Sequence, residues 1–493
     1  MTMRQIITLA GCALILGVGG ARAAEEVNLW PASVRWPGVT NEPGEKWQAV
    51  GPLFFRTIAP DQSNFSGLRP LYLHHTDKRQ TYEESTFLYP LFSIRRDQKV
   101  SRWTVFNLIN RTRPLDPQSP GAVPHSFDVW PLYFSRDTGA PETSYHALFP
   151  VAGTIKSRFG FDRLQWMVFP LFMQTEKAGV VSTSTPWPII KRSTGNGHEG
   201  FAVWPLFGHG EKPGQYRQQF YLWPLIYKNE FRLSEPVPSV QEGFLPFYTR
   251  EQRAGAISEN FVWPFFGYTK QQTPVTYNET RYLWPLLVQG RGEERYVNRW
   301  APIYTHSNRK GIDKKWYLWP LLRTEQWTAD GLVQNKDQFV WFFYWSLQQR
   351  SARNPQLAAA YKTHLWPLLS VWDNGAGRRQ AQFPSPLAVF FPTNEKVRQL
   401  YTPLFALYRY DQKTPDDVRH ALLWNAITWH RSPGKREFHL GPLLSTERGT
   451  SGARVAIGNG LIGMKRDADK QKWRLFLFDF SRGKHKGEPS TTK

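Results

Sequence analysis

Few residues in this 493-residue sequence have the types and spacing that catalysis or metal binding requires. The 12 histidines include one adjacent pair, His74-His75, and none lies in an HExxH pattern or at a comparable spacing from a carboxylate. The acidic pairs Glu83-Glu84 and Glu293-Glu294 fall at predicted turns or strand ends, where a solvated surface is the usual explanation. No Gly-x-Ser-x-Gly elbow or phosphate-binding glycine loop occurs. The sequence therefore favours a non-catalytic protein over an enzyme, and it predicts no cofactor or metal site.

Tryptophan has the most suggestive spacing in the chain. Neighbouring copies lie about 20 residues apart, such as Trp204 and Trp223, or Trp263 and Trp284. The repeated residues are Trp130, Trp204, Trp223, Trp263, Trp284, Trp319 and Trp366. Stacked indoles can bind sugar rings or line an acyl-chain groove, but large aromatic side chains at strand centres usually form core. We therefore predict that these tryptophans are core residues.

Each of these tryptophans belongs to a repeated motif of the type Tyr-Leu-Trp-Pro-Leu-Leu. The motif at 282–287 contains Trp284-Pro285, and close copies at 317–322 and 364–369 contain Trp319-Pro320 and Trp366-Pro367. Looser copies extend from Gly51-Pro52 to Gly441-Pro442. A uniform repeat of this kind can carry a long chain as one structural unit.

One turn cluster is recognisable between successive motifs, and this predicts one strand per unit. Examples are Lys212-Pro213-Gly214, Gly290-Arg291-Gly292 and Asp373-Asn374-Gly375, whose Gly and Asn residues tolerate the positive φ of hairpin turns. Each strand would then be roughly 12 to 14 residues long. In the motif at 282–287 both alternating faces are apolar, which predicts strands covered on both sides at their middle. The repeated proline would form a ring of β-bulges, because proline cannot donate a ladder hydrogen bond.

These features predict an all-β fold, an antiparallel meander of about twenty strands built from ~20-residue WPL-type repeats. Aromatic residues, which strands favour, make up 15% of the chain. We expect the meander to be closed or barrel-like, because closure removes exposed strand edges. A β-propeller remains the alternative, since its stacked blades also bury both faces of each sheet.

The sequence divides into four segments. Residues 1–23 resemble a secretory signal peptide, with Arg4, an apolar run and a small-x-small cleavage site ending at Ala23. A lipoprotein-like alternative would use Cys12, the only cysteine, and we favour simple cleavage near Ala23. Residues 24–49 are predicted to be an irregular lead-in, 50–480 a single β-repeat domain, and 481–493 a basic disordered tail.

The formal net charge of +22 predicts acidic partners. For an exported protein these are anionic lipid headgroups, lipopolysaccharide or acidic polysaccharide, and no nucleic acid is expected; the sequence does not specify an oligomeric state. We expect a location in the outer membrane or periplasm of a Gram-negative bacterium. The favoured function is an outer-membrane or outer-membrane-associated scaffold, pore or conduit. The alternative is a soluble periplasmic or secreted module that binds anionic glycan or lipopolysaccharide.

Overall fold

The described part of the chain forms one continuous antiparallel sheet. The computed structural model describes residues 26–36, 46–59, 61–79, 81–117, 123–450, 452–469 and 472–479. Within these ranges, 45 strands follow one another in chain order, and each pairs with the next through an antiparallel ladder. The all-β antiparallel meander is therefore confirmed, whereas the β-propeller alternative is wrong because the sheet is not divided into blades.

The strands are between 3 and 8 residues long. The first fifteen are β1 Val27–Leu29, β2 Ser33–Trp36, β3 Lys46–Ala49, β4 Phe54–Ile58, β5 Asn64–Leu68, β6 Tyr72–Thr76, β7 Glu83–Phe87, β8 Phe92–Arg96, β9 Val100–Val105, β10 Ile109–Pro114, β11 His125–Val129, β12 Tyr133–Asp137, β13 Tyr145–Leu148, β14 Ala152–Arg158 and β15 Phe161–Met167. The next fifteen are β16 Phe172–Lys177, β17 Val180–Ser184, β18 Ile190–Gly195, β19 His198–Val203, β20 Phe207–Lys212, β21 Tyr216–Tyr221, β22 Ile226–Phe231, β23 Ser239–Phe244, β24 Tyr248–Arg253, β25 Ala256–Phe261, β26 Phe266–Gln271, β27 Tyr277–Leu283, β28 Leu287–Gly292, β29 Arg295–Trp300 and β30 Tyr304–Arg309. The last fifteen are β31 Ile312–Tyr317, β32 Leu322–Ala329, β33 Leu332–Phe339, β34 Tyr344–Ser351, β35 Ala360–Leu365, β36 Leu369–Asp373, β37 Arg379–Phe383, β38 Tyr408–Thr414, β39 Asp417–Leu422, β40 Ile427–Ser432, β41 Lys435–Leu440, β42 Leu444–Gly449, β43 Gly452–Ile457, β44 Ile462–Asp467 and β45 Arg474–Leu477.

The predicted number of about twenty long strands is wrong, because each unit contains two short strands. The second turn of the unit is the motif itself: β27 ends at Leu283, Trp284-Pro285-Leu286 turns, and β28 begins at Leu287. The predicted turns at Gly214 and Gly375 are confirmed, and both glycines have a φ of +72°. The one at Gly290-Arg291-Gly292 is wrong, since these residues end β28.

Three of the predicted segments lie at the two ends of the chain. The segment 24–49 was expected to be irregular, but its described residues form β1, β2 and β3 and join the sheet. The predicted signal peptide (1–23), with Cys12 and Ala23, lies outside the described residues. So does the predicted basic tail (481–493).

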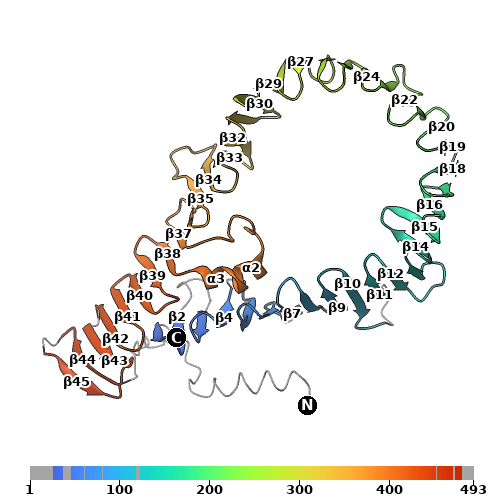
Figure 1. Ribbon diagram of the computed structural model, residues 1–493. Coiled ribbons are helices and arrows are strands. Elements are labelled where there is room, and N and C mark those ends of the chain that lie inside the picture. The colour runs from blue at the N-terminus through green and yellow to red at the C-terminus, as the bar shows by residue number, and fades with distance from the viewer. Residues whose placement is uncertain are drawn as a thin grey trace, which may run out of the picture.

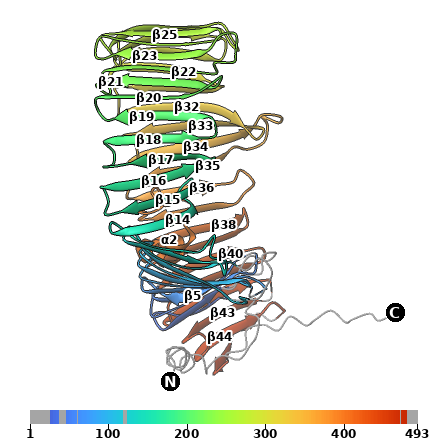
Figure 2. The same cartoon turned by 90° about the vertical axis from the view of Figure 1, so that its right-hand side faces the viewer.

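The sheet curls into a ring (Figure 1). Figure 1 looks along the strands, and Figure 2 shows them stacked side by side from the edge. The ring returns on itself where β1 to β4 meet β38 to β41, while β42 to β45 continue past this meeting point. Within the described residues every ladder joins consecutive strands, so the closed barrel expected from the sequence is not formed by backbone hydrogen bonds, and the two ends of the ring meet without a ladder between them.

Two short helices between β37 and β38 identify the inner face of the ring. Helices α2 (Glu395–Leu400) and α3 (Thr402–Phe405) lie inside the ring (Figure 1). Leu400 of α2 is fully buried against Phe55, Phe65 and Leu73. Phe55 and Leu73 therefore face the inside of the ring, and so do the residues directly opposite them across the ladders. Because successive side chains of a strand point to opposite faces, the residues next to these in sequence face outward. In the part of the chain that the structure describes, no helix is long and apolar enough to cross a membrane.

The inner face carries a small apolar core where the sheet curves between β12 and β15. Phe134, Tyr145, Ala147, Ile155 and Trp166 are buried together there. Their close packing requires a glycine at 153, since a Cβ at this position would lie 2.5 Å from the Cβ of Ala147 and 2.9 Å from the indole of Trp166.

We expect Gly153→Ala to destabilise the protein by about 1–3 kcal/mol, because neither neighbour can move away without disturbing the core. Thermal unfolding would measure this as a lower melting temperature. The matched control is Gly210→Ala, where the nearest atom to the new Cβ is 3.2 Å away at the end of the His198 side chain. Equal melting temperatures for the two variants would contradict this account of the packing.

Candidate functional site

The motif turns all lie on one rim of the ring, which we call the apolar rim. In the described chain every connection from an odd-numbered to an even-numbered strand, apart from the β37–β38 excursion that contains α2 and α3, is at this rim and contains the motif or a degenerate copy. The opposite rim holds the turns built from glycine and polar residues. This separation follows from a meander with two strands per unit, because alternate turns must fall at opposite ends of the strands.

The predicted burial of the repeated tryptophans is wrong. Six of them are between 40% and 57% exposed: Trp130, Trp204, Trp223, Trp263, Trp284 and Trp319. Trp366 differs, since it is half-buried, packs on Phe342 and Phe390, and donates from Nε1 to the carbonyl of Pro386 at 3.0 Å. The tryptophans therefore belong to a surface belt and not to a core.

The prolines lie in the turns and form no β-bulges. Pro285, Pro320 and Pro367 each follow tryptophan through a cis peptide bond at the third position of a four-residue turn, the arrangement of a type VI turn. The leucine that follows each proline donates its N–H back across the turn, as from Leu286 to the Leu283 carbonyl at 2.7 Å.

Neighbouring motif turns are hydrogen-bonded to one another, so the ladder continues into the rim. In the turn 222–225, Leu222 donates to the Leu206 carbonyl at 2.6 Å, and Trp223 donates to the Pro205 carbonyl at 2.7 Å. Leu225 donates within its own turn to Leu222 at 2.8 Å. All three N–H groups of this turn are thus paired, and Pro224 has none to pair. Proline fits the motif because it occupies the one position that has no available acceptor.

A row of apolar side chains on the outer face borders the motif turns. These residues stand directly opposite one another across the ladders, so they share one face of the sheet. Between β20 and β26 the row consists of Phe207, Tyr221, Ile226, Phe244, Tyr248, Phe261 and Phe266. We call this set and its continuation around the ring the outer apolar row. Together with the turns it forms a belt of exposed apolar surface.

The apolar belt is shallow. The next outward-facing residues lie two positions further along each strand, or roughly 7 Å from the outer apolar row. There the side chains become polar, as at His209, Gln219, Lys228 and Glu242. Between β20 and β23 the outer surface therefore changes from apolar to polar within about 10 Å of the rim.

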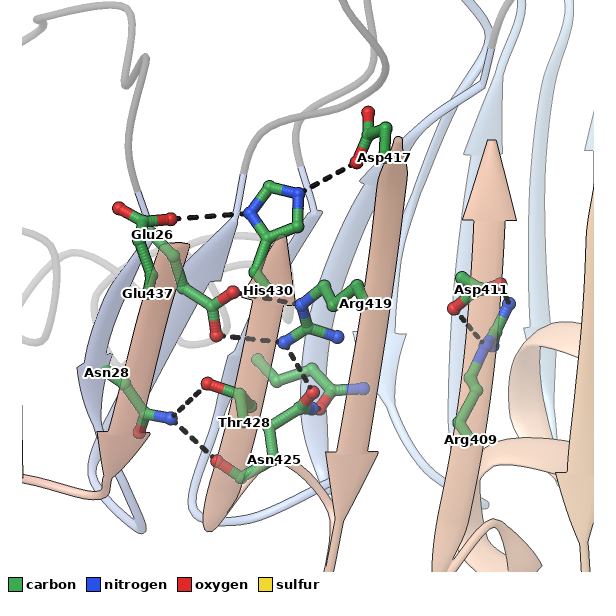
Figure 3. Close-up of polar contacts among 11 residues, drawn as sticks. Glu26, Asn28, Arg409, Asp411, Asp417, Arg419, Asn425, Thr428, His430 and Glu437 are labelled. Atoms are coloured by element: carbon green, nitrogen blue, oxygen red, sulfur yellow. Dashed lines mark hydrogen bonds and ion pairs between the residues drawn. The ribbon is translucent and has the colours of Figure 1, made fainter. Parts of the chain in front are cut away.

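A second notable arrangement is the seam where the two ends of the ring meet (Figure 3). Glu26, which precedes β1, is 1% exposed and forms two hydrogen bonds of 2.9 Å with Arg419 of β39. Burial by itself raises the pKa of Glu26, but the guanidinium of Arg419 more than offsets this, and the pKa is lowered. Arg419 also lies over the ring of Trp36 at 4.7 Å, so both partners are desolvated and paired.

Amide side chains extend the seam across residues almost 400 positions apart. Asn28 donates to the carbonyl of Asn425 at 2.7 Å, and Asn425 donates to Oε1 of Gln48 at 2.7 Å. Asn459 donates to the carbonyl of Asn28 at 2.5 Å. These bonds close the ring through side chains of β1 and β3 on one side and of the loops around β40 and β43 on the other.

A histidine held between two carboxylates lies beside this network (Figure 3). Nε2 of His430 is 2.8 Å from Asp417, and Nδ1 is 3.3 Å from Glu437. Burial lowers the pKa of His430, but hydrogen bonds to the two carboxylates outweigh it and raise the pKa to about 9. Burial likewise raises the pKa of Glu437, and its bonds to His430 and Lys435 outweigh it and lower the pKa to about 2. The cluster is therefore ionised near neutral pH.

The excursion that contains α2 braces the ring from inside. Arg69, which lies 3.8 Å above the ring of Phe55, donates from Nε to the carbonyl of Gln399 in α2 at 2.5 Å. Tyr401 donates to the carbonyl of Tyr89 at 2.6 Å, and Lys396 forms an ion pair with Glu84 at 2.5 Å. Glu84, one of the two residues of the acidic pair Glu83-Glu84, is thus buried in a structural contact.

The other chemically suggestive residues do not converge. His74 and His75 point to opposite faces of β6, and His75 stacks on Phe65 with ring centroids 4.2 Å apart. Glu293 accepts a hydrogen bond from Thr276 at a turn. Among the described residues, no group of three or more histidine, cysteine or acidic side chains is placed to hold a metal ion.

Sequence reasoning did not identify the seam residues. Glu26 lies in the segment expected to be irregular, and Asn425 replaces proline in a degenerate copy of the motif, Leu423-Trp424-Asn425-Ala426. That departure from the repeat was the one available signal, because the side-chain amide of Asn425 accepts from Arg419 and donates to Gln48.

No protein-family model matches the chain, and no curated protein shows detectable sequence similarity to it.

We expect Arg419→Met to open the seam, because Glu26 would remain as an unpaired buried charge, at a cost of about 3–5 kcal/mol. Spin labels on cysteines introduced at the exposed positions Arg56 and Arg436, with Cys12 replaced by serine, would report a longer and broader distance. Arg448→Met, which removes an exposed arginine of β42, is the matched control and should leave the distance unchanged. An unchanged distance in Arg419→Met would show that the seam does not hold the ring closed.

The His430 cluster predicts a pH dependence. Since the pKa of His430 is raised, its stabilising contribution is complete below about pH 6.5 and is lost as the pH rises through about 9. The loss should amount to roughly 3 kcal/mol. Thermal unfolding between pH 6 and 10 would measure it, and His430→Gln should flatten this alkaline decline. An equally steep decline in His430→Gln would assign the effect to other groups.

Proposed function

We propose that this protein is a non-catalytic scaffold or conduit of the cell envelope that docks on a lipid membrane through its apolar rim. The observation that supports the proposal most is the belt of exposed tryptophan, leucine and phenylalanine side chains that follows the apolar rim around the ring. Monomeric soluble proteins rarely expose contiguous apolar surface of this extent, and such surface usually marks an interface.

The backbone at the rim suits an apolar environment. A peptide N–H that enters hydrocarbon without a partner costs several kcal/mol. The turns avoid this cost, because the N–H groups of Leu222, Trp223 and Leu225 are bonded to carbonyls of the same or the preceding turn. The same pattern recurs at Leu318, Trp319 and Leu321.

The depth of the belt supports docking in one leaflet over spanning. A bilayer has a hydrocarbon thickness of about 30 Å, and membrane-spanning barrels carry an outer apolar band about 25 Å tall. Between β20 and β23 the outer surface becomes polar within about 10 Å of the rim, which matches the 5–10 Å burial of interfacial elements. Tryptophan and tyrosine favour this interfacial depth, since their rings are apolar and carry one polar group.

The net charge and the N-terminal signal extend the proposal to a location. A charge of +22 favours a surface of anionic lipid or lipopolysaccharide. The predicted export signal favours the outer membrane or periplasm of a Gram-negative bacterium, with the ring attached to one leaflet. A ring that stands on a membrane by one rim is suited to holding or guiding another molecule along its axis.

An alternative is a module that binds anionic glycan, and one inner-face arrangement favours it. The ammonium groups of Lys336 and Lys362 lie 5.6 and 5.8 Å from the ring of Trp345. An indole flanked by two cations offers both a stacking surface for a sugar ring and charge for an acidic group. Salt-sensitive retention on an acidic polysaccharide column that is lost in Lys336→Gln/Lys362→Gln would favour this function.

The rim proposal predicts the effect of removing apolar side chains from the motif turns. We expect the triple variant Leu206→Ser/Leu225→Ser/Leu286→Ser to bind vesicles about 100-fold more weakly, from roughly 1 kcal/mol for each side chain that enters the lipid. Co-flotation with vesicles that contain anionic phospholipid would measure the binding.

The matched control places the same change on the opposite rim. Val237 and Leu357 are exposed apolar residues of polar-rim loops, so Val237→Ser/Leu357→Ser should bind vesicles as the unchanged protein does. Equal binding by the triple variant and the unchanged protein would exclude the rim as the membrane contact. If two copies of the protein associate through their apolar rims in the absence of lipid, this too would exclude the rim as the membrane contact.

A further inference from the structure

The outer face of the ring has a hollow between β10 and β13, close to the apolar rim. Its volume is about 420 Å³, within the range of pockets that bind small ligands, roughly 300–1,000 Å³. It is lined by Arg111, His125, Ser126, Phe127, Ser135, Asp137 and His146. We call it the β10–β13 hollow.

The strand register explains the shape of this hollow. Arg111 stands opposite Phe127, Phe127 opposite Ser135, and Ser135 opposite His146, so the four form one row across the outer face. Ser135 is small, and its hydroxyl donates a hydrogen bond to the Phe127 carbonyl on the neighbouring strand at 3.1 Å. The space above it stays open between the longer side chains on either side.

The hollow adjoins the outer apolar row directly. Ile109, Val129, Tyr133 and Leu148 belong to that row, and each precedes or follows a lining residue by two positions on its strand. A molecule in the hollow would therefore have apolar side chains on its rim side. On the other side are His125 and Asp137, which stand opposite each other in the next outward row.

The polar groups of the hollow suit an anion on the rim side. The Arg111 guanidinium has no hydrogen-bond or ion-pair partner among the described residues. His146 has its Nδ1 within 3.1 Å of the Tyr133 hydroxyl. Asp137 is occupied at the far end, where its Oδ1 accepts the N–H of Gly139 at 3.0 Å. A negative charge would thus be attracted to Arg111 and kept away from Asp137.

We propose that the β10–β13 hollow binds the phosphate group of an anionic phospholipid. The acyl chains of this lipid would run along the outer apolar row towards the rim, and Arg111 would pair with the phosphate. The proposal rests on the membrane docking proposed above, since the hollow lies where headgroups of the contacted leaflet would be. It assigns to this part of the ring a lipid-selective site, in addition to the non-selective contact made by the turns.

A soluble lipid tests the hollow independently of membrane insertion. Dihexanoyl phosphatidic acid, used below its critical micelle concentration, should bind the full-length protein in isothermal titration calorimetry. Arg111→Gln should weaken this binding by about tenfold, the usual loss for one charge-assisted hydrogen bond. Dihexanoyl phosphatidylcholine, which has the same chains and no net charge, should bind much more weakly.

The matched control is Arg113→Gln, which removes an exposed arginine of the same strand that does not line the hollow. It should bind dihexanoyl phosphatidic acid as the unchanged protein does. Equal weakening by Arg113→Gln would mean general charge attraction and would overturn the proposal. Inorganic phosphate that binds as tightly as the lipid would also overturn it, because the site would then be a phosphate site without lipid selectivity.

The two proposals fail in different experiments. If the β10–β13 hollow does not bind the lipid phosphate, Arg111→Gln binds the soluble lipid as the unchanged protein does, while the triple leucine variant still loses vesicle binding. If rim docking is wrong, the triple variant floats with vesicles as before, while the soluble lipid still distinguishes Arg111→Gln from Arg113→Gln. Melting temperatures within about 2 °C of the unchanged protein would exclude misfolding as a cause.

Discussion

Backbone hydrogen bonds between consecutive strands are the interaction on which this structure depends, because the described chain forms one curved sheet. Most sheets gain stability by packing a buried face against another layer. Here that contribution is local, as in the cluster around Trp166 and in the contact of Leu400 with Phe55. Each strand is therefore held mainly by its two neighbours, as in repeat proteins where every unit contacts the next.

A sheet of this kind must still deal with its two ends. Full closure by a ladder would remove both edges, but β1 and β45 do not pair. The ring instead overlaps itself, and a buried ion pair between Glu26 and Arg419 joins the overlapping faces. Buried ion pairs contribute little net stability but penalise any state that breaks them. The seam therefore fixes where the ends of the sheet meet.

The motif serves the ladder and the rim at once. Its proline removes an N–H for which the turn has no acceptor. Most of its tryptophan and leucine side chains stay exposed because no other described part of the chain packs over those turns. Both facts support the membrane docking proposed above, because exposed apolar side chains are unfavourable in water and the paired N–H groups need no water. The polar opposite rim differs because its turns use glycine and polar residues, which water solvates.

The sequence by itself determined that the chain is all-β, antiparallel and repetitive, since composition and period are local properties. It also located polar turns such as those at Gly214 and Gly375, because glycine there is a local requirement of positive φ. It could not show that the motif is a turn, since Tyr282 to Leu287 alternates like a strand and no second turn signal appears. Only the tertiary structure decided which residues close the ring and where the tryptophans lie. Glu26 and Arg419 are 393 positions apart, and only the accumulated curvature of the whole sheet brings them together.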